Sequence, residues 1–284
     1  QLKHTFDGSK IYIPLSETLP HLRGYSLMQE FKRPSNPDEK IYLQEAKVPQ
    51  AMMFSDALDS HSQQVTTRFL NEVQRPERFT DSKNWTEGDR LTALIWYFIH
   101  TSQDLFVSLP YDCDFCGGKH HNNFDVRELA KVYQNLKGKP FREVSFKSKA
   151  LTFKPITGEG LEAVQGIRIN SEEPDSKRTK ALMLFERILW SLFFSDRDAS
   201  LVDRREWMNS LTATEYLALA GEYAQAQDDM KHGIEHIYDD GDTCLPIPPH
   251  QCINKYKLPE DEQGGAITTL RWPFLSNFFI PSLY

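Results

Sequence analysis

The sequence predicts an α+β fold with a mainly helical core, short antiparallel strands and a cysteine hairpin that resembles part of a zinc ribbon. Two long segments carry apolar residues at helical spacing, which indicates amphipathic helices. Shorter segments of strand-like composition lie around them. The sequence Cys-x-x-Cys-Gly-Gly at 113–118 lies between two apolar segments, which indicates a metal-binding turn at the tip of a hairpin.

The bulk composition excludes several classes of function. A chain of 284 residues can bury a core in one large domain or in two of ordinary size. Its net charge of −7 disfavours a surface that coats nucleic acid, since that role needs clustered lysines and arginines. No apolar run approaches the roughly 20 residues of a membrane span, and the first residues lack the order of a signal peptide. We therefore expect a protein of the cytoplasm that binds neither nucleic acid nor membrane.

Residues 1–54 are expected to form an extended N-terminal arm with some β-structure. The segments 10–15 and 40–43 have the composition of short strands, and prolines such as Pro14 and Pro34 restrict the backbone around them. Two interpretations remain for this region: an arm that grips a neighbouring subunit, or an ordinary sheet edge.

Residues 55–137 are expected to be helical and to include the cysteine hairpin. Apolar spacing predicts a helix within 62–73, and Thr86 begins a capping-box sequence, Thr-Glu-Gly-Asp. The apolar stripe that follows, at 91–99, is so broad that this helix must be buried on several sides.

Residues 138–235 are expected to contain a strand pair followed by a second helical region. The strand-like segments are 142–146 and 150–155, and Thr212 begins a second capping-box sequence. Residues 236–284 are expected to form an extended C-terminal tail that carries the last two cysteines.

The end of this tail is rich in aromatic residues and prolines. A segment as apolar as 272–281 is expected to dock, either on its own domain or on a partner. Deleting 272–284 is therefore predicted to abolish assembly or solubility while the remaining domain stays folded. The candidate partner-binding residues are Trp272, Phe274, Phe278 and Phe279.

The cysteines favour structural zinc as a cofactor. Cys113 and Cys116 supply two ligands, whereas a structural zinc site needs four. The remaining ligands are either a nearby histidine with a distant group, or the second cysteine pair, which would join distant parts of the chain. The candidates for these positions are His120, His121, Cys244 and Cys252. Buried thiols without a metal are the alternative.

Catalytic motifs are not found in the sequence. It contains no His-Glu-x-x-His, no glycine-rich phosphate loop and no Gly-x-Ser-x-Gly elbow. A redox role for the Cys-x-x-Cys is disfavoured, because thioredoxin-like motifs open a helix whereas Gly117 and Gly118 indicate a loop. We therefore predict that the protein is not an enzyme.

Three segments together form a layout that points to a protein family. The first is the apolar helix from Asp89 to His100, which leads into the Cys-x-x-Cys-Gly hairpin. The second is the extended segment 151–157, Leu-Thr-Phe-Lys-Pro-Ile-Thr, and the third is the aromatic end at 272–281. In this layout the chain resembles the baseplate hub and hub-assembly proteins of T4-like contractile-tail bacteriophages. It departs from their pattern in having a single Cys-x-x-Cys.

The resemblance implies a structural function. The protein would be a virion component near the hub of a contractile-tail baseplate, assembled in the host cytoplasm, with other baseplate and tail subunits as partners. Proline-bearing ends and aromatic enrichment agree with burial between subunits.

Two alternatives to this structural function remain. One is a zinc-ribbon module associated with nucleic acid, which would need more basic residues on the ribbon. The other is a metal-dependent hydrolase with an open coordination position.

Overall fold

The computed structural model describes residues 28–257, 259–260 and 264–281, and within these residues the fold is α+β, as predicted. The strands of this part of the chain pair antiparallel, in sheets of only two or three strands. Sheets this small cannot form a core alone, so the helices must supply most of it. The strands are β1 (Met28–Arg33), β2 (Asn36–Gln44), β3 (Phe106–Asp112), β4 (Lys119–Asp125), β5 (Tyr133–Gln134), β6 (Arg142–Phe146), β7 (Lys149–Phe153), β8 (Leu192–Phe194), β9 (Gly233–Ile234), β10 (Ile237–Asp239), β11 (Asp242–Pro246), β12 (His250–Gln251), β13 (Ile267–Thr268) and β14 (Arg271–Pro273).

Two of the helices begin at the capping boxes that the sequence predicts. The Thr86 hydroxyl accepts a hydrogen bond from the Asp89 amide at 3.2 Å, and the Thr212 hydroxyl accepts one from the Glu215 amide at 3.3 Å. Each threonine thereby satisfies an amide that the helix itself leaves without a partner. The helices are α1 (Val48–Phe54), α2 (Ser62–Glu72), α3 (Glu87–Thr101), α4 (Gly158–Ile169), α5 (Lys177–Ser191), α6 (Leu201–Asn209) and α7 (Ala213–Asp229).

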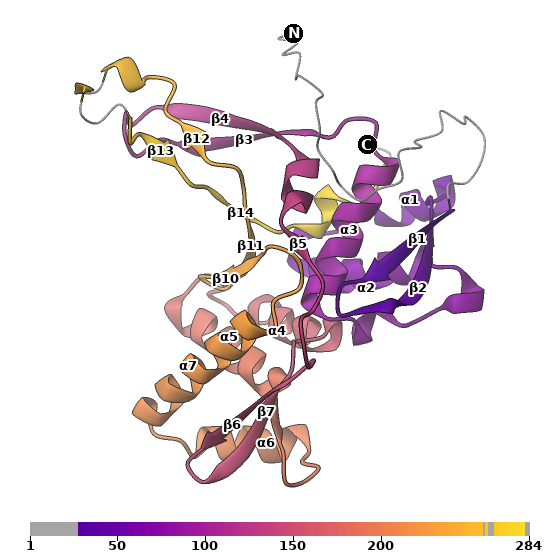
Figure 1. Ribbon diagram of the computed structural model, residues 1–284, viewed down its shortest axis with the longest axis vertical. Coiled ribbons are helices and arrows are strands. Elements are labelled where there is room, and N and C mark those ends of the chain that lie inside the picture. The colour runs from indigo at the N-terminus through magenta and orange to yellow at the C-terminus, as the bar shows by residue number, and fades with distance from the viewer. Residues whose placement is uncertain (1–27, 258, 261–263, 282–284) are drawn as a thin grey trace.

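The first hydrophobic core is built around α3, which is buried on several sides as its broad apolar stripe predicts. Leu94 and Ile95 are fully buried in this core, together with Phe69 of α2 and Trp85 just before α3. The Tyr97 hydroxyl accepts a hydrogen bond from the Ala46 amide at 2.7 Å, which ties the end of β2 to the helix. Figure 1 shows α3 between the β1–β2 hairpin and the strands of the C-terminal part.

The N-terminal region belongs to this first core. The predicted strand at 40–43 lies within β2, whereas the predicted strand at 10–15 lies outside the described residues. Phe31, Ile41 and Leu43 are buried against α3 and its neighbours. From residue 28 onward the chain is therefore part of the folded body, because its alternating apolar residues cover the core.

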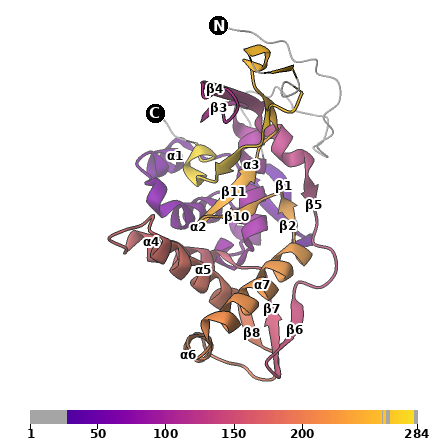
Figure 2. The same cartoon turned by 90° about the vertical axis from the view of Figure 1, so that its left-hand side faces the viewer.

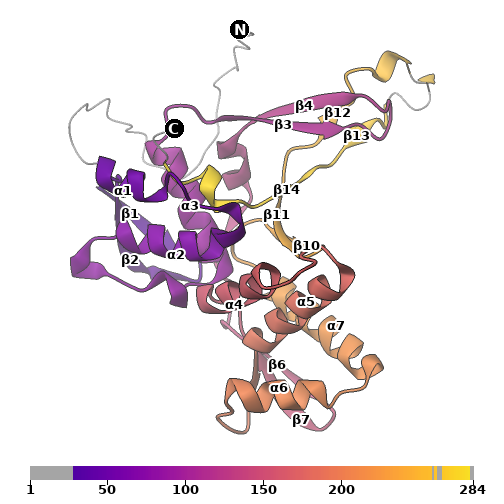
Figure 3. The ribbon, with the colours of Figure 1, turned by 180° about the vertical axis from the view of Figure 1, so that it is seen from behind.

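A second core lies in the middle of the sequence. The strands β6 and β7 form the predicted pair, and β8 extends their sheet to three strands. Phe153 of β7, Leu189 of α5 and Leu219 of α7 are buried together in this core. Figures 1 and 3 both place β6, β7 and α6 at the end of the molecule away from β3 and β4.

The two cores meet where α3 and α4 begin. The Glu87 amide donates to the Ile156 carbonyl at 3.0 Å, and the Gly158 amide donates to the Trp85 carbonyl at 2.9 Å. A Cβ at Gly158 would lie 2.2 Å from a guanidinium nitrogen of Arg90, so this close approach requires glycine. In Figure 2, α4 and α5 cross the middle of the molecule between α2 and α6.

The C-terminal tail docks on its own domain, one of the two destinations that the sequence left open. β14 pairs with β11, and the Phe279 ring lies in the first core, 5.6 Å from the Phe98 ring between centroids. Trp272 and Phe274 pack against the same core. Phe279 is therefore part of the protein's own core and is not available to a partner. Trp272 and Phe274 are half-buried and Phe278 is exposed, so for these three residues contact with a partner stays a prediction.

The hydrophobic cores thus group the chain differently from the four consecutive regions expected from the sequence. Residues of the predicted tail, including Leu245 and Ile280, share the first core with α2 and α3. The second core takes residues from 151 to 230. The burial of the aromatic tail explains why the two ends of the chain share one core, because the tail packs its apolar side chains against α2 and α3.

This packing predicts opposite consequences for two neighbouring phenylalanines. Phe279 is 1% exposed and Phe278 is 41% exposed. Phe279→Ala should lower the free energy of unfolding by about 3–5 kcal/mol, because it leaves a cavity in the core. Phe278→Ala should cost less than half as much. Urea unfolding of the two variants measures the difference, and equal losses would contradict the assignment of Phe279 to the core.

Deleting 272–284 should likewise unfold the first core, contrary to the expectation from the sequence.

Candidate metal centre

The Cys-x-x-Cys lies at the turn between β3 and β4, as predicted. The two strands pair without interruption from Phe106–Asp125 to Asp112–Lys119. At the turn, the Cys113 amide donates to the Gly118 carbonyl and the Gly117 amide donates to the Cys113 carbonyl, both at 2.9 Å. Gly117 has a φ of 66°, a conformation that glycine adopts without the steric cost of a Cβ. This turn brings the sulfurs of Cys113 and Cys116 to the same side.

A third cysteine reaches the turn from the second hairpin, β12–β13. Cys252 directly follows β12, and its amide donates to the Ala266 carbonyl at 2.8 Å. The Lys255 amide donates to the Cys252 carbonyl at 3.2 Å, so the chain turns after Cys252 much as it does after Cys113. Lys255 stands where a second Cys-x-x-Cys would have its second cysteine.

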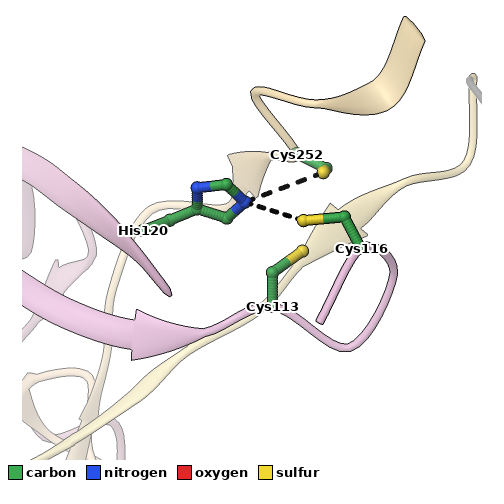
Figure 4. A group of neighbouring side chains, drawn as sticks. All are labelled: Cys113, Cys116, His120 and Cys252. Atoms are coloured by element: carbon green, nitrogen blue, oxygen red, sulfur yellow. Dashed lines mark hydrogen bonds between the residues drawn. The ribbon is translucent and has the colours of Figure 1, made fainter. Parts of the chain in front are cut away.

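Four side chains converge at this point: Cys113, Cys116, His120 and Cys252 (Figure 4). Their sulfurs and one ring nitrogen all lie within 4.8 Å of one another. The His120 Nε2 lies 3.1 Å from the Cys116 Sγ and 3.9 Å from the Cys252 Sγ. Three of the four residues are buried, and Cys116 is half-buried. His120 of β4 therefore supplies the fourth ligand atom, which an ordinary ribbon takes from a cysteine of its second turn.

The donor set fits tetrahedral zinc. Three thiolates and one imidazole are a common structural zinc set, and Zn–S and Zn–N bonds of about 2.3 and 2.1 Å place neighbouring ligand atoms about 3.5–3.8 Å apart. The two distances from His120 lie on either side of that range. A metal ion at the centre would thus need only small movements of the side chains.

The surroundings affect the two thiols in opposite ways. The Gly118 amide hydrogen-bonds to the Cys116 sulfur, and with His120 and Asn254 it lowers the pKa of Cys116 to about 6. Burial, together with the neighbouring sulfurs of Cys113 and Cys116, raises the pKa of Cys252 to about 11. Cys116 therefore loses its proton more readily than Cys252, and metal binding requires that both sulfurs be deprotonated.

Two of the candidate ligands do not join this group. His121 is exposed on the other side of β4, because successive residues of a strand point to opposite faces. The alternation could have identified His120 from the sequence, since Asn122 and Phe124 are buried on its side of β4. Cys244 lies in β11, where it pairs with Ile237 and Pro273. The proposed pairing of Cys244 with Cys252 as ligands is therefore wrong, because β11 belongs to the sheet that contacts the first core.

Contacts between the hairpins support the centre, and no local pattern in the sequence predicts them. The Tyr111 hydroxyl lies 2.6 Å from the His250 Nδ1, and the Asn122 amide group donates to the Pro248 carbonyl at 3.1 Å. We call the four strands β3, β4, β12 and β13, with the turns at Cys113–Gly118 and Cys252–Lys257, the cysteine arm. Figures 1 and 3 show that the arm extends away from the rest of the molecule.

Comparisons with known proteins place this centre in no family. No protein-family model matches the chain, and searches of curated proteins and of solved structures find no significant match. Among the described residues, no helix combines the length and the apolar character that crossing a membrane requires.

Proposed function

We propose that the protein is a structural subunit of a contractile-tail bacteriophage baseplate, at or near the hub, and that it acts through protein–protein interfaces. The layout of helix, cysteine hairpin and aromatic end carries the resemblance to hub and hub-assembly proteins. The observation that most supports an interface role is the cysteine arm, whose tip carries exposed apolar side chains. The protein would assemble in the host cytoplasm and remain in the virion tail.

The donor set supports a structural metal and not a catalytic one. Catalytic zinc sites keep one coordination position for water or substrate, whereas four protein ligands close a tetrahedral site. Cys113, Cys116, His120 and Cys252 together provide four. Zinc at this centre would join two hairpins that lie far apart in the sequence, which makes the arm rigid. The hydrolase alternative is disfavoured for this reason.

The tip of the arm is suited to contact another protein. Phe115 is 39% exposed, Ile253 is 61% exposed and Tyr256 is 68% exposed, and all three lie on the two turns that carry the cysteines. Aromatic and aliphatic side chains on a rigid support provide contact area at a small loss of conformational entropy. We infer that these three residues form the arm's contact with a partner subunit.

The charge around the tip disfavours the nucleic-acid alternative. The exposed lysines there, Lys119, Lys255 and Lys257, are accompanied by exposed acidic groups. These are Asp112, Asp114 and Glu260. A surface with similar numbers of positive and negative charges does not bind the phosphate backbone of nucleic acid as a basic patch does.

Sedimentation tests the proposal directly. The chain, tagged and expressed from its own genome, is expected to co-sediment with contractile-tail particles at a fixed stoichiometry. Mass spectrometry of the particle fraction would identify the chain and its neighbours. Recovery only as a free protein, or only with nucleic acid, would contradict the baseplate assignment.

Charged substitutions at the tip should separate assembly from folding. Ile253→Asp and Tyr256→Asp are each expected to keep zinc and fold but to reduce incorporation into tail particles by about tenfold or more, as expected for residues central to an interface. Leu217→Asp is the control, because Leu217 is 70% exposed on α7, away from the arm. Equal incorporation of all three variants would contradict a role for the tip.

A further inference from the structure

The metal centre gathers three of the four cysteines of the chain, and thiols can be oxidised as well as bind metal. The sulfurs of Cys113, Cys116 and Cys252 all lie within 4.8 Å of one another. When one of several neighbouring thiolates is oxidised to a sulfenic acid, another can attack it and form a disulfide. The atoms that would hold a metal ion in the reduced protein can therefore also form a bond that excludes the ion.

Cys116 is the sulfur that a small oxidant should reach first. It is half-buried, whereas the other three members of the centre are buried. Phe115 and Gly117 on either side of it are exposed, and a Cβ at Gly117 would have no atom within 4 Å. Oxidation of cysteines follows their thiolate character and their exposure, and metal binding keeps every sulfur ligand deprotonated. Exposure therefore decides among the three sulfurs in favour of Cys116.

Cys113 is the thiol best placed to pair with Cys116. Both lie in one tight turn, which the Gly117 amide closes by donating to the Cys113 carbonyl at 2.9 Å. Residues three apart in such a turn have Cα atoms within about 7 Å of each other, and a disulfide needs roughly 4.4–6.8 Å. Cys252 belongs to the other hairpin, so its sulfur stays near only while the two hairpins remain together.

The oxidation balances with hydrogen peroxide as the oxidant. The Cys116 thiolate attacks one peroxide oxygen, the O–O bond breaks, and a sulfenic acid and a hydroxide result. The Cys113 thiolate then attacks the Cys116 sulfur, the S–O bond breaks, and the S–S bond forms with release of a second hydroxide. The two sulfurs together lose two electrons and the peroxide gains them. Two protons from the solvent convert the hydroxides into water.

The disulfide would remove two of the four ligands and with them the link between the hairpins. A structural zinc site needs four protein ligands, and only His120 and Cys252 would remain. The local apolar cluster cannot replace the metal, because its buried members are Cys113, Cys252 and Ala266, and two of these three are ligands themselves. Without the metal, the β3–β4 and β12–β13 hairpins should therefore separate at their turns.

Separation of the turns would divide the tip surface. Phe115 lies on the first turn, whereas Ile253 and Tyr256 lie on the second. A partner that contacts all three side chains needs both turns in fixed relative positions, since ordering them again on binding costs conformational entropy. The state of the cysteines therefore controls whether the tip presents one continuous surface.

We propose that the metal centre is a redox switch: peroxide joins Cys113 to Cys116, the metal ion is released, and the tip loses its contact surface. The proposal rests on the metal centre and the tip contact of the proposed function, and it applies whichever protein the partner is. A reducing cytoplasm keeps thiols reduced and so favours the metal-bound state during assembly. Thiol–disulfide exchange reverses the switch.

Peroxide treatment of the zinc-loaded full chain tests the proposal. A chromogenic chelator measures the released zinc, and mass spectrometry of peptides under non-reducing conditions identifies the disulfide. We expect zinc release in proportion to a Cys113–Cys116 disulfide, and recovery of zinc binding after treatment with dithiothreitol. Zinc that stays bound in excess peroxide would overturn the proposal. A disulfide from Cys116 to Cys252 would also overturn it, because that bond would tie the hairpins together.

Two variants locate the reaction. Cys244→Ala should release zinc as the unmodified chain does, because Cys244 is buried in β11 outside the centre. Cys116→His still offers four ligands but cannot form the disulfide, so its zinc should stay bound in peroxide. Equal loss of zinc from zinc-loaded Cys116→His and from the unmodified chain would overturn the proposal. The peptide map of the unmodified chain decides the pairing by itself if Cys116→His binds no zinc.

Hydrogen–deuterium exchange measures the opening of the arm. Peroxide should increase exchange in β3, β4 and β12 of the unmodified chain and leave α3 and α7 protected. Unchanged exchange in the arm after zinc release would overturn the loss of the tip surface. A full chain that binds no zinc would contradict the metal centre and this proposal with it, whereas zinc retained in peroxide contradicts this proposal alone. The experiment uses no tail particles, so its result is independent of the baseplate assignment.

Discussion

Zinc content is expected to fall to background in Cys252→Ser, whereas Cys244→Ala should bind zinc as the unmodified chain does. Cys252 supplies the one ligand that comes from the second hairpin, and Cys244 lies in β11 outside the group. Structural zinc in small domains contributes roughly 10–16 kcal/mol of apparent binding free energy, which becomes folding free energy of the segments that hold it. Metal quantification by native mass spectrometry measures the difference between the two variants.

Loss of the metal should act on the arm and leave the cores folded. In Cys252→Ser, hydrogen–deuterium exchange is expected to increase in β3, β4 and β12, while the amides of α3 and α7 stay protected. The arm has few buried apolar residues of its own, so the centre supplies much of its stability. A variant lacking Cys252 that still binds stoichiometric zinc would show that other residues hold the metal.

Arg187→Met is expected to lower the free energy of unfolding by about 3–5 kcal/mol, since it leaves the Glu87 carboxylate buried without its cation. The pair connects α3 of the first core with α5 of the second, and the Thr243 hydroxyl donates to the same carboxylate at 2.5 Å. Glu87 and Arg187 are both buried. Urea unfolding monitored by circular dichroism provides the measurement.

An exposed ion pair provides the control for this variant. Arg271 pairs with Asp239 at 2.6 Å, and both side chains are about half exposed. Arg271→Met should cost about 0–1 kcal/mol, because solvent screens such pairs. Replacing Glu87 with leucine as well as Arg187 with methionine should recover part of the loss, since no buried charge then remains. Equal losses in Arg187→Met and Arg271→Met would contradict the burial of the Glu87–Arg187 pair.

The same pair predicts how stability changes in acid. Burial alone would raise the pKa of Glu87, but the attraction of Arg187 outweighs it and lowers that pKa from 4.5 to about 2. A carboxylate with a depressed pKa stabilises the fold fully above pH 4.5, and this contribution disappears as the pH falls through about 2. The shift corresponds to roughly 3 kcal/mol. In Glu87→Gln this acid-dependent loss should be missing, which unfolding at pH 7, 4 and 2.5 would detect.

Features with a local cause could be predicted from the sequence. The cysteine hairpin follows from two cysteines and two glycines in one turn, and all four residues take the positions that this turn requires. The capping threonines are a second example, because Thr86 and Thr212 bond to amides only three residues away. The strand pair β6–β7 is a third, since its turn joins neighbouring segments.

Features that join distant segments needed the structure. From the sequence, both Cys244 and Cys252 were possible ligands. The structure shows that Cys244 lies in β11, which pairs with β10 and β14 and is not part of the metal centre. The sequence left open whether the aromatic tail docks on its own domain or on a partner, because its apolar character is visible there but its target is not. Phe98 of α3 is part of that target, since its ring contacts the rings of Phe278 and Phe279.

The sequence by itself determined the fold class, the turn that carries Cys113 and Cys116, and the starts of α3 and α7. The turn and the two helix starts depend on residues within a few positions of one another. The tertiary structure alone decided which distant groups complete each site. It placed Cys252 beside His120, Arg187 beside Glu87, and the aromatic tail in the first core. The physical reason is that these contacts depend on how whole elements pack, and the spacing of residues along the chain does not specify that packing.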